Sequence, residues 1–392
     1  MLIQFSIENH RSIKDNAVIS FAASKDKSLE SYLLHPDEKK ALLPAIALYG
    51  ANAAGKSNVL HALMTMKDMV IGDAAKISKG QKLPWEPFGD TTSPTSFEIV
   101  FIYHGVRYAY GYSFDAKKIY NEYLYHWPNG REALIFSRED GKYEFRENVN
   151  EQITLSNRTP DNKLYLVSSN DWNLPQTENA YKWFLEKLTF LMEQAPSSSE
   201  TVAQIISDDE KKARILKELL LADLGISDVA VKNISGKTPV ITTTHRIIRE
   251  DGSIEHFQLL MDQESSGTQR FFARIGGWLQ ALESGALLIV DEIEVSLHPL
   301  LTKRLIEMVQ DNTVNTDGAQ LLFTTHDAML LDLTFFRRDQ IWFAEKDDKS
   351  CATELYSLAS FSPRKGENIR KGYLQGRFGA IPFIGGDALW QE

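Results

Sequence analysis

Hydrophobic and polar residues alternate at the start of the chain, over residues 2–8 and again over 17–23. A period of two predicts strands that bury one face. Residues 25–41 are charged and interrupt this pattern, which predicts a loop or a short helix. A five-residue apolar run at 45–49 predicts a buried strand, and the stretch from residue 58 to about 70 predicts a helix.

Further along, the patterning changes twice. The segment 97–145 is aromatic and β-branched and is divided by turn residues such as Asp140-Gly141, which predicts an antiparallel meander. Residues 178–223 follow a helical period, and a second hairpin is predicted to turn at Asp251-Gly252. From there to about residue 345, helices and strands alternate, as is typical of a parallel sheet covered by helices. The patterning therefore predicts an α/β protein.

The predicted strand at 45–49 leads directly into a glycine-containing loop. Gly50, four further residues and then Gly55-Lys56-Ser57 match the phosphate-binding loop (P-loop) pattern G-x-x-x-x-G-K-[ST], in the strand–loop–helix context that the motif requires. Glycines let the backbone approach phosphate oxygens, and the helix N-terminus attracts negative charge. We expect Lys56 to reach the outer phosphates of ATP and Ser57 to bind Mg²⁺. The expected nucleotide-binding residues of the loop are Gly50, Asn52, Ala53, Ala54, Gly55, Lys56, Ser57 and Asn58.

Two carboxylates end another apolar run. The stretch "ALLIVDEIEVSLHP", residues 286–299, predicts a central strand with Asp291 and Glu292 at its carboxyl end. Ligands of open α/β sheets bind at that end. Asp291 is therefore expected to hold Mg²⁺ through water, and Glu292 to polarise the attacking water as a general base.

A small hydroxyl residue and a glycine lie just ahead of another predicted helix. Ser265 and Gly267, in "QESSGTQRFF", would form a second anion site at that helix N-terminus. Serine and glycine also cap helices without binding anything, so the pattern is weak by itself. Together with the P-loop and the Asp-Glu pair, it resembles the signature motif of ABC-type ATPases.

Two further stretches resemble motifs of the same class. "LLFTTHDAML", residues 321–330, predicts a buried strand that presents His326, which resembles the switch histidine that senses the γ-phosphate. Ser296-Leu297-His298 resembles the D-loop that crosses a dimer interface. The opening "IQFSIENHRSIKDNAVISF" is similar to the start of the SMC, Rad50 and RecF branch, where residues such as Arg11 and Ser12 lie near the nucleotide.

The C-terminal part of the sequence resembles a smaller group within this class of ATPases. "LFTTHDAMLLDLTFFRRDQIWFAEKD" and "ENIRKGYLQGRFGAIPFI" resemble the bacterial RloA- and AbiL-type ATPases, the AAA_15/AAA_21 group tied to phage defence. This implies a P-loop NTPase fold of the ABC-head type, with a mixed or parallel core sheet, an antiparallel β subdomain and a short helical lobe. The expected parts are 1–145, the first half of the head; 146–235, the helical lobe; and 236–392, the second half.

The resemblance also implies partners and an activity. We expect an ATPase that uses ATP and Mg²⁺, forms a homodimer or a higher homo-oligomer around ATP, and controls a separately encoded effector such as a nuclease or a Toprim-like protein in antiviral defence of the abortive-infection type. The alternative is a RecF-like ATPase that clamps DNA during maintenance or repair. A self-sufficient nuclease would need a second carboxylate cluster; Glu345, Asp347 and Asp348 form the only one nearby, and "EKDDKS" predicts a hairpin turn.

The composition of the chain limits the partners and the cellular compartment that we expect. The 392 residues have a net charge of −10, which argues against a general affinity for nucleic acid, although a local basic groove stays open. The single cysteine, Cys351, excludes an internal disulfide and fits a reducing compartment. The N-terminus does not match a signal peptide, and no apolar run is long enough for a membrane span. We therefore expect a cytoplasmic protein without a membrane partner.

Overall fold

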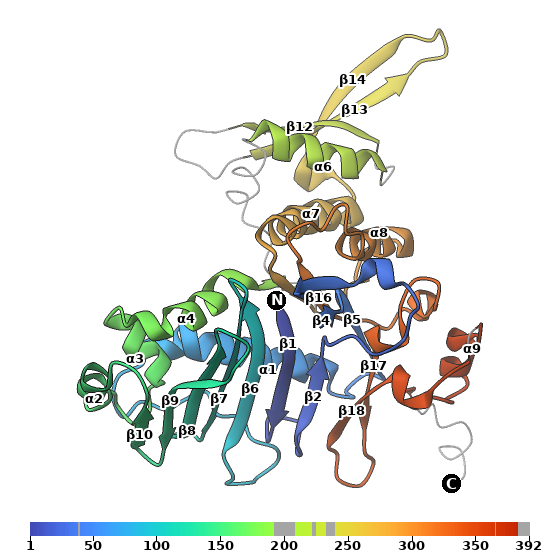
Figure 1. Ribbon diagram of the computed structural model, residues 1–392. Helices are drawn as coiled ribbons and strands as arrows, with labels where there is room; N and C mark the ends of the chain where they lie inside the picture. Colours follow the sequence, from blue (N-terminus) through green and yellow to red (C-terminus); the bar gives the residue numbers. More distant parts are fainter. Residues whose placement is uncertain (38–39, 192–207, 222–224, 233–239, 365, 383–392) are drawn as a thin grey trace, which may run out of the picture.

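A six-stranded sheet forms the centre of the molecule (Figure 1). The computed structural model describes residues 1–37, 40–191, 208–221, 225–232, 240–364 and 366–382. The strand order is β11-β15-β16-β5-β17-β18, and every neighbouring pair is parallel except β17 and β18. The strands are β5 (Ala45–Tyr49), β11 (Leu188–Leu191), β15 (Leu287–Val290), β16 (Gln320–Thr324), β17 (Ile341–Lys346) and β18 (Thr353–Ser357). The parallel sheet predicted from the helix–strand alternation is confirmed.

Both faces of this sheet are buried, as the continuous apolar runs require. Successive side chains of β5 point to opposite faces, so Ile46 and Leu48 join one hydrophobic core while Ala45, Ala47 and Tyr49 join the other. The first core contains residues of α1 (Lys56–Ile71), and the second contains residues of α7 (Ser266–Ser284) and α8 (Pro299–Gln310). These two layers of packing fix where the carboxyl ends of the central strands lie.

A seven-stranded antiparallel sheet lies beside the core, and α1 packs between the two. Its order is β10-β9-β8-β7-β6-β1-β2, so the predicted meander is confirmed and the two N-terminal strands continue it. The strands are β1 (Leu2–Glu8), β2 (Ala17–Ser20), β6 (Thr95–Tyr103), β7 (Val106–Phe114), β8 (Ile119–Trp127), β9 (Ala133–Glu139) and β10 (Lys142–Phe145). The aromatic residues Tyr108, Tyr110 and Tyr112 are buried and serve as core.

Three helices form the predicted short helical lobe against this sheet. They are α2 (Val149–Ser156), α3 (Tyr165–Asp171) and α4 (Pro175–Lys187). The range 146–235 is not helical throughout, however, because β11 joins the core sheet and β12 (Ile226–Lys232) joins a third sheet. The division of the chain at residues 145 and 235 stays a prediction.

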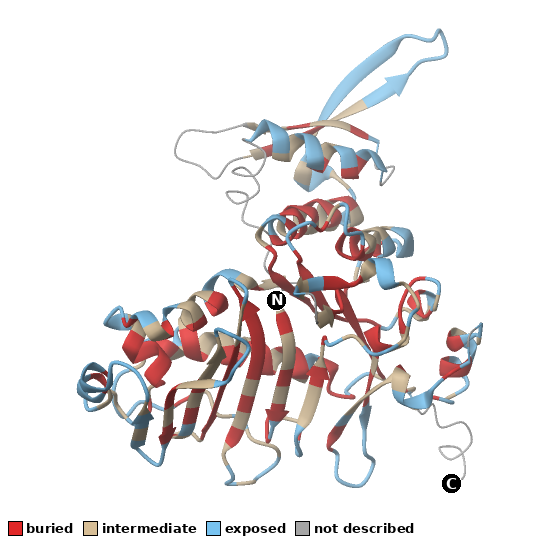
Figure 2. Cartoon of the chain, in the orientation of Figure 1, coloured by how far each residue is buried: buried red, intermediate tan, exposed pale blue. Residues whose placement is uncertain are grey.

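The third sheet has the order β12-β13-β14 and is covered by α6 (Asp209–Leu221). β13 (Val240–Ile248) and β14 (Ile254–Leu260) form the hairpin predicted at Asp251-Gly252, and its tip projects away from the body (Figures 1 and 2). The expectation of a loop or short helix at 25–41 is wrong in part. Two short strands, β3 (Leu34–Asp37) and β4 (Lys40–Leu42), pair there.

The remaining elements are short. Helix α9 (Ile369–Leu374) lies near the C-terminal end of the described chain. The 3₁₀ turns are η1 (Glu30–Tyr32), η2 (Ala74–Lys76), η3 (Met261–Gln263), η4 (Ala328–Leu330), η5 (Arg338–Gln340) and η6 (Leu358–Phe361). None of the described helices combines the length and the apolar character needed to cross a membrane.

Candidate active site

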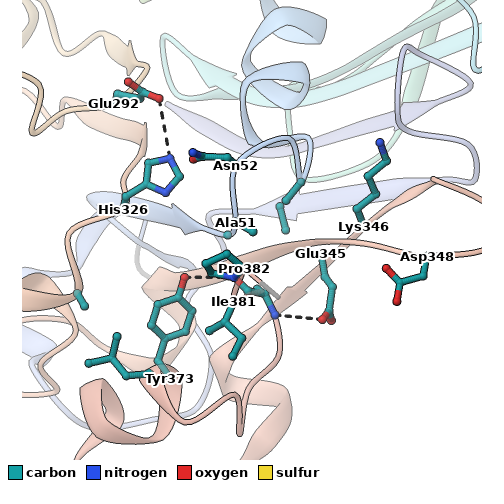
Figure 3. A pocket seen from close by; sticks show the side chains of 16 residues that line it. Ala51, Asn52, Glu292, His326, Glu345, Lys346, Asp348, Tyr373, Ile381 and Pro382 are labelled. Atoms are coloured by element: carbon teal, nitrogen blue, oxygen red, sulfur yellow. Dashed lines mark hydrogen bonds and ion pairs between the residues drawn. The ribbon is translucent and has the colours of Figure 1, made fainter. Parts of the chain in front are cut away.

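A cavity with a volume of about 1050 Å³ opens at the carboxyl ends of the central strands. One wall consists of the loop after β5, including Gly50, Ala51, Asn52 and Ala54. Glu292 and His326, which follow β15 and β16, also line it (Figure 3). Three neighbouring parallel strands therefore deliver the predicted loop, carboxylate and histidine to one cavity.

The opposite wall comes from the C-terminal part of the chain. Glu345 and Lys346 end strand β17, Asp348 lies in the turn that follows, and Tyr373 and Ile381 lie in and after α9 (Figure 3). The backbone N–H of Ala380 donates to Glu345 Oε1 at 3.1 Å, which anchors the segment after α9 to β17. Patterning gave no signal that residues 373–382 would face the P-loop, because the contact joins segments about 300 positions apart.

The P-loop adopts a conformation that needs small residues. Gly50 has a φ of 157°, and a Cβ there would lie 2.4 Å from the carbonyl oxygen of Ala344 on β17. Gly55, at φ 100°, forms the N-cap of α1, and a Cβ there would lie 2.0 Å from Thr353 Oγ1 and 2.7 Å from Ser12 Oγ. Both motif glycines therefore permit a close approach of another segment to the loop.

Lys56 is buried within the loop. Its ammonium donates to the carbonyl oxygens of Gly50 at 2.9 Å and Ala51 at 3.0 Å. Desolvation lowers its pKa, although the carboxylates of Asp291, Glu292 and Glu294 act in the opposite direction. The lysine is therefore held close to where the loop would receive phosphates, with three carboxylates around it.

Asp291 and Glu292 are positioned by a buried threonine. The hydroxyl of Thr324, at the end of β16, donates to Asp291 Oδ1 and accepts the backbone N–H of Glu292 at 2.7 Å. Glu292 has a φ of 46°, a left-handed conformation that a residue of this kind rarely adopts. Thr324 was not predicted as a site residue, although its position before His326 in "FTTHD" was available from the sequence.

His326 lies beside the proposed general base. Its Nε2 is 3.9 Å from Glu292 Oε1, and its backbone N–H donates to Glu294 Oε1 at 2.5 Å. The other oxygen of Glu294 is buried and has no hydrogen-bond partner among the described residues. Glu294 is thus a third carboxylate of this site that the sequence analysis did not single out.

Arg11 and Ser12 follow β1, and Ser12 contacts the start of α1. Ser12 Oγ accepts from Asn58 Nδ2 at 2.7 Å and lies 2.7 Å from Thr353 Oγ1, so it braces the first turn of α1. Arg11 points to Glu86, with Nε 2.7 Å from Oε2. Neither residue lines the cavity. Ser12 therefore lies beside the P-loop, whereas the side chain of Arg11 is committed to an ion pair.

Ser265 and Gly267 start helix α7, as predicted. Ser265 Oγ accepts the backbone N–H of Thr268 at 3.1 Å and is therefore a helix cap. Gly267 lies next to the predicted D-loop, because a Cβ there would be 3.3 Å from the carbonyl oxygen of Ser296. Neither residue lines the cavity of its own chain. A role on a nucleotide stays a prediction.

The residues present fit a nucleotide with a divalent cation. The exposed hydroxyl of Ser57, the carboxylate of Asp291 and the unpartnered oxygen of Glu294 are hard oxygen donors, which Mg²⁺ prefers. Backbone N–H groups of the loop and the start of α1 supply an environment for phosphates. The carboxylate of Glu292 lines the same cavity.

The fold is that of a P-loop NTPase, with the P-loop strand β5 separated by β16 from the strand that carries the Asp-Glu pair. The chain belongs to the AAA_21 family, described as "AAA domain, putative AbiEii toxin, Type IV TA system", whose model matches residues 45–332. The family description assigns an AAA domain, a class of ATPase domain, to this part of the chain. Its family implies nucleotide binding with a divalent metal ion.

Solved structures similar to this chain include SMC heads. One is an SMC head bound to the C-winged helix domain of ScpA, with 13% identity, coverage of 92% of this chain and 99% of that chain, and a TM-score of 0.42. The SMC head domain from Thermotoga maritima has 12% identity, 91% and 98% coverage and a TM-score of 0.41. An SMC head with an extended coiled coil, bound to the C-terminal domain of ScpA derived from Pyrococcus furiosus, has 12% identity, 96% and 99% coverage and a TM-score of 0.41. No curated protein sequence matches the chain.

Proposed function

We propose that the protein binds ATP with Mg²⁺ in the cavity at the strand ends and hydrolyses it slowly, as a switch. The observation that carries this proposal is the convergence of the P-loop, Glu292 and His326, from three adjacent parallel strands, on one cavity. A partly enclosed site of this kind strengthens electrostatic interactions with phosphates because it limits solvent screening.

Each predicted residue has a part in this reaction. The backbone of the loop, residues 50–58, cradles the phosphates, and Lys56 neutralises the outer ones. Ser57 and Asp291 hold Mg²⁺, which supplies charge neutralisation when it is bound. Glu292 takes the proton of the attacking water, a role worth about 10² to 10⁴ in rate for a positioned base. His326, 3.9 Å from Glu292, orients that water and senses the γ-phosphate.

We further propose that the site is completed by a second copy of the chain. Ser265 and Gly267 lie outside the cavity of their own chain, at the start of α7. Two ATP molecules would be enclosed between the subunits, each held by the P-loop of one chain and the Ser265–Gly267 helix start of the other. Higher homo-oligomers would be built from such dimers.

The biological role that we propose is antiviral defence, in which the ATPase controls a separately encoded effector such as a nuclease. Support comes from the family, whose description names a putative toxin of a toxin–antitoxin system, and from the resemblance to RloA- and AbiL-type ATPases. A cytoplasmic location fits this role. Co-purification of the chain with the product of a neighbouring nuclease or Toprim gene tests it, and binding of duplex DNA in place of such a partner would favour the RecF-like alternative.

Lys56→Ala tests nucleotide binding. The variant should lose binding of labelled ATP, because it removes the buried ammonium that is held against the loop carbonyls of Gly50 and Ala51. Binding at the wild-type affinity would show that the loop does not hold the phosphates.

Glu292→Gln tests hydrolysis separately. The amide has nearly the same shape as the carboxylate but cannot accept a proton from water. We expect ATP binding to persist while turnover falls by about 10² to 10⁴. Normal phosphate release by this variant would assign the general base to another residue.

A further inference from the structure

A second cluster of chemically active side chains lies outside the cavity. His10, His61 and Glu86 each offer one ligand atom, and these atoms all lie within 4.8 Å of one another. His10 is in the turn after β1, His61 is in α1, and Glu86 is in the segment between η2 and β6. Three separate segments therefore meet at one point beside the helix that follows the P-loop.

The spacing of the ligand atoms suits a tetrahedral metal ion. His10 Nε2 lies 3.3 Å from His61 Nδ1, and His61 Nδ1 lies 3.7 Å from Glu86 Oε2. Four ligands at about 2.0–2.1 Å from Zn²⁺ are about 3.3–3.4 Å from one another. The His10–His61 distance already has this length, and the His61–Glu86 distance needs a shift of a few tenths of an ångström by a half-exposed glutamate. The third distance, between the ligand atoms of His10 and Glu86, is within 4.8 Å, so the same glutamate would also have to move toward His10.

The buried imidazole of His10 is poorly satisfied without an ion. Its ring is fully buried, and its Nδ1 has no hydrogen-bond partner among the described residues. Its Nε2 faces only a long contact with another imidazole, which is a weak hydrogen bond at 3.3 Å. A metal ion bound to Nε2 would give this nitrogen a stronger partner than the contact with His61 does, whereas Nδ1 would keep its present surroundings.

Arg11 occupies part of the site. Its guanidinium contacts both oxygens of Glu86, at 2.7 and 3.3 Å. The two side chains are 34% and 47% exposed, and an ion pair this accessible contributes little because water screens it. A metal ion can therefore displace the Arg11 guanidinium from the Glu86 carboxylate, and the Arg11 side chain can then adopt another rotamer.

We propose that His10, His61 and Glu86 bind one Zn²⁺ ion per chain, with water as the fourth ligand. Two imidazoles and one carboxylate favour a first-row transition metal over Mg²⁺ or Ca²⁺, which prefer oxygen ligands. The ion would join the β1–β2 turn and the segment around Glu86 to α1. The site uses none of the cavity residues, so it does not rest on the proposed ATP reaction.

The test compares Zn²⁺ binding by the full chain and three variants after removal of metal with a chelator. Glu86→Gln and His61→Gln remove a ligand but keep the size of the side chain approximately. His256→Gln is the matched control, because His256 is an exposed histidine on β14 outside the cluster. Equilibrium dialysis against Zn²⁺ alone, followed by metal analysis, gives the number of ions and their affinity.

We expect the wild-type protein and His256→Gln to bind one more Zn²⁺ per chain than either cluster variant, or to bind it at least about tenfold more tightly. Co²⁺ should give the intense visible spectrum of a tetrahedral site in the same two proteins only. Circular dichroism should show that Glu86→Gln is folded, since residue 86 is exposed.

Thermal unfolding supplies a second readout. Zn²⁺ should raise the melting temperature of the wild-type chain and of His256→Gln, because it cross-links three segments of the folded state only. Equal Zn²⁺ content, Co²⁺ spectra and thermal shifts in all four proteins would overturn the proposal. ATP binding measured in parallel would be unaffected by that outcome, so the two proposals fail separately.

Discussion

Replacing Gly55 by alanine tests how tightly β18 and the β1–β2 turn are packed on the P-loop. The new Cβ would lie 2.0 Å from Thr353 Oγ1, 2.9 Å from Thr353 Cγ2 and 2.7 Å from Ser12 Oγ. A change of rotamer at Thr353 would not remove the overlap with the new Cβ, because both Oγ1 and Cγ2 of Thr353 lie close to it. Its hydroxyl is also held 2.7 Å from Ser12 Oγ and 2.9 Å from the carbonyl oxygen of Ala54.

Gly80→Ala is the matched control for the backbone. Gly80 has a φ of 83°, close to the 100° of Gly55, but a Cβ there meets nothing within 4 Å. A side chain in the left-handed region lowers the free energy of unfolding by about 1–2 kcal/mol. Alanine also makes the unfolded chain less flexible than glycine does, which raises the free energy of unfolding by about 0.4–1 kcal/mol. Gly80→Ala should therefore lower the free energy of unfolding by at most about 1.5 kcal/mol.

Gly55→Ala should lower the free energy of unfolding by an additional 1–3 kcal/mol or so, which is the usual cost of overpacking. Urea unfolding followed by circular dichroism measures both variants against the wild type, with unchanged m-values as the condition for comparison. The same proteins are then tested for labelled ATP, which Gly80→Ala should bind normally and Gly55→Ala should not. Equal losses of stability in the two variants would refute the claim that Thr353 and Ser12 pack too closely on Gly55 to admit a side chain.

Two further predictions concern acid stability and nuclease activity. Burial, with smaller contributions from His61 and Arg11, lowers the pKa of His10 from 6.5 to about 4, so the unfolded chain takes up the proton first. Stability conferred by the neutral ring is present above pH 6.5 and is lost as the pH falls toward 4. In metal-free buffer the free energy of unfolding should therefore fall by about 2 kcal/mol between pH 7 and pH 5. In urea titrations, the free energy of unfolding of His10→Phe should change less with pH than that of the wild type. An identical change with pH in both proteins would contradict this prediction. Highly purified protein should not nick DNA with Mg²⁺ or Mn²⁺, because the carboxylate of Asp347 already accepts hydrogen bonds from Ser350 within the turn. Nicking that disappears in the double variant Asp347→Ala plus Asp348→Ala would prove this wrong.

Much of the fold around the site could be predicted because its signals are local. The strand at 45–49, the strand ending at Asp291 and the strand ending at Thr324 are apolar runs followed directly by polar residues, and all three were placed correctly. Both Asp-Gly hairpins were also found, because a turn that needs a positive φ restricts the residue type.

The errors and omissions involve contacts between distant parts of the chain. β11 follows α4 without a break and was included in a helical segment, because its strand state depends on parallel pairing with β15, about 100 positions later. Thr353 contacts Ser12 across 341 positions, and Thr324 contacts Asp291 across 33. The pairing of His10 with His61 and Glu86 likewise arises only when the β1–β2 turn packs against α1.

The measurement that tests the shared active site most directly is complementation between two inactive variants. Lys56→Ala has a defective loop but a sound Ser265–Gly267 segment. Gly267→Asp has a sound loop but would place a carboxylate against the partner's γ-phosphate. Each variant alone should be inactive in ATP hydrolysis. A mixed dimer contains one site with both intact parts and one site with both lesions.

Differently tagged chains can confirm that the subunits exchange. After exchange, we predict that ATP hydrolysis returns to at most about half of the wild-type rate per mixed dimer, and to less if the two sites must act together. Full activity of Gly267→Asp alone would contradict the account, because Ser265 and Gly267 would then be no more than the start of helix α7.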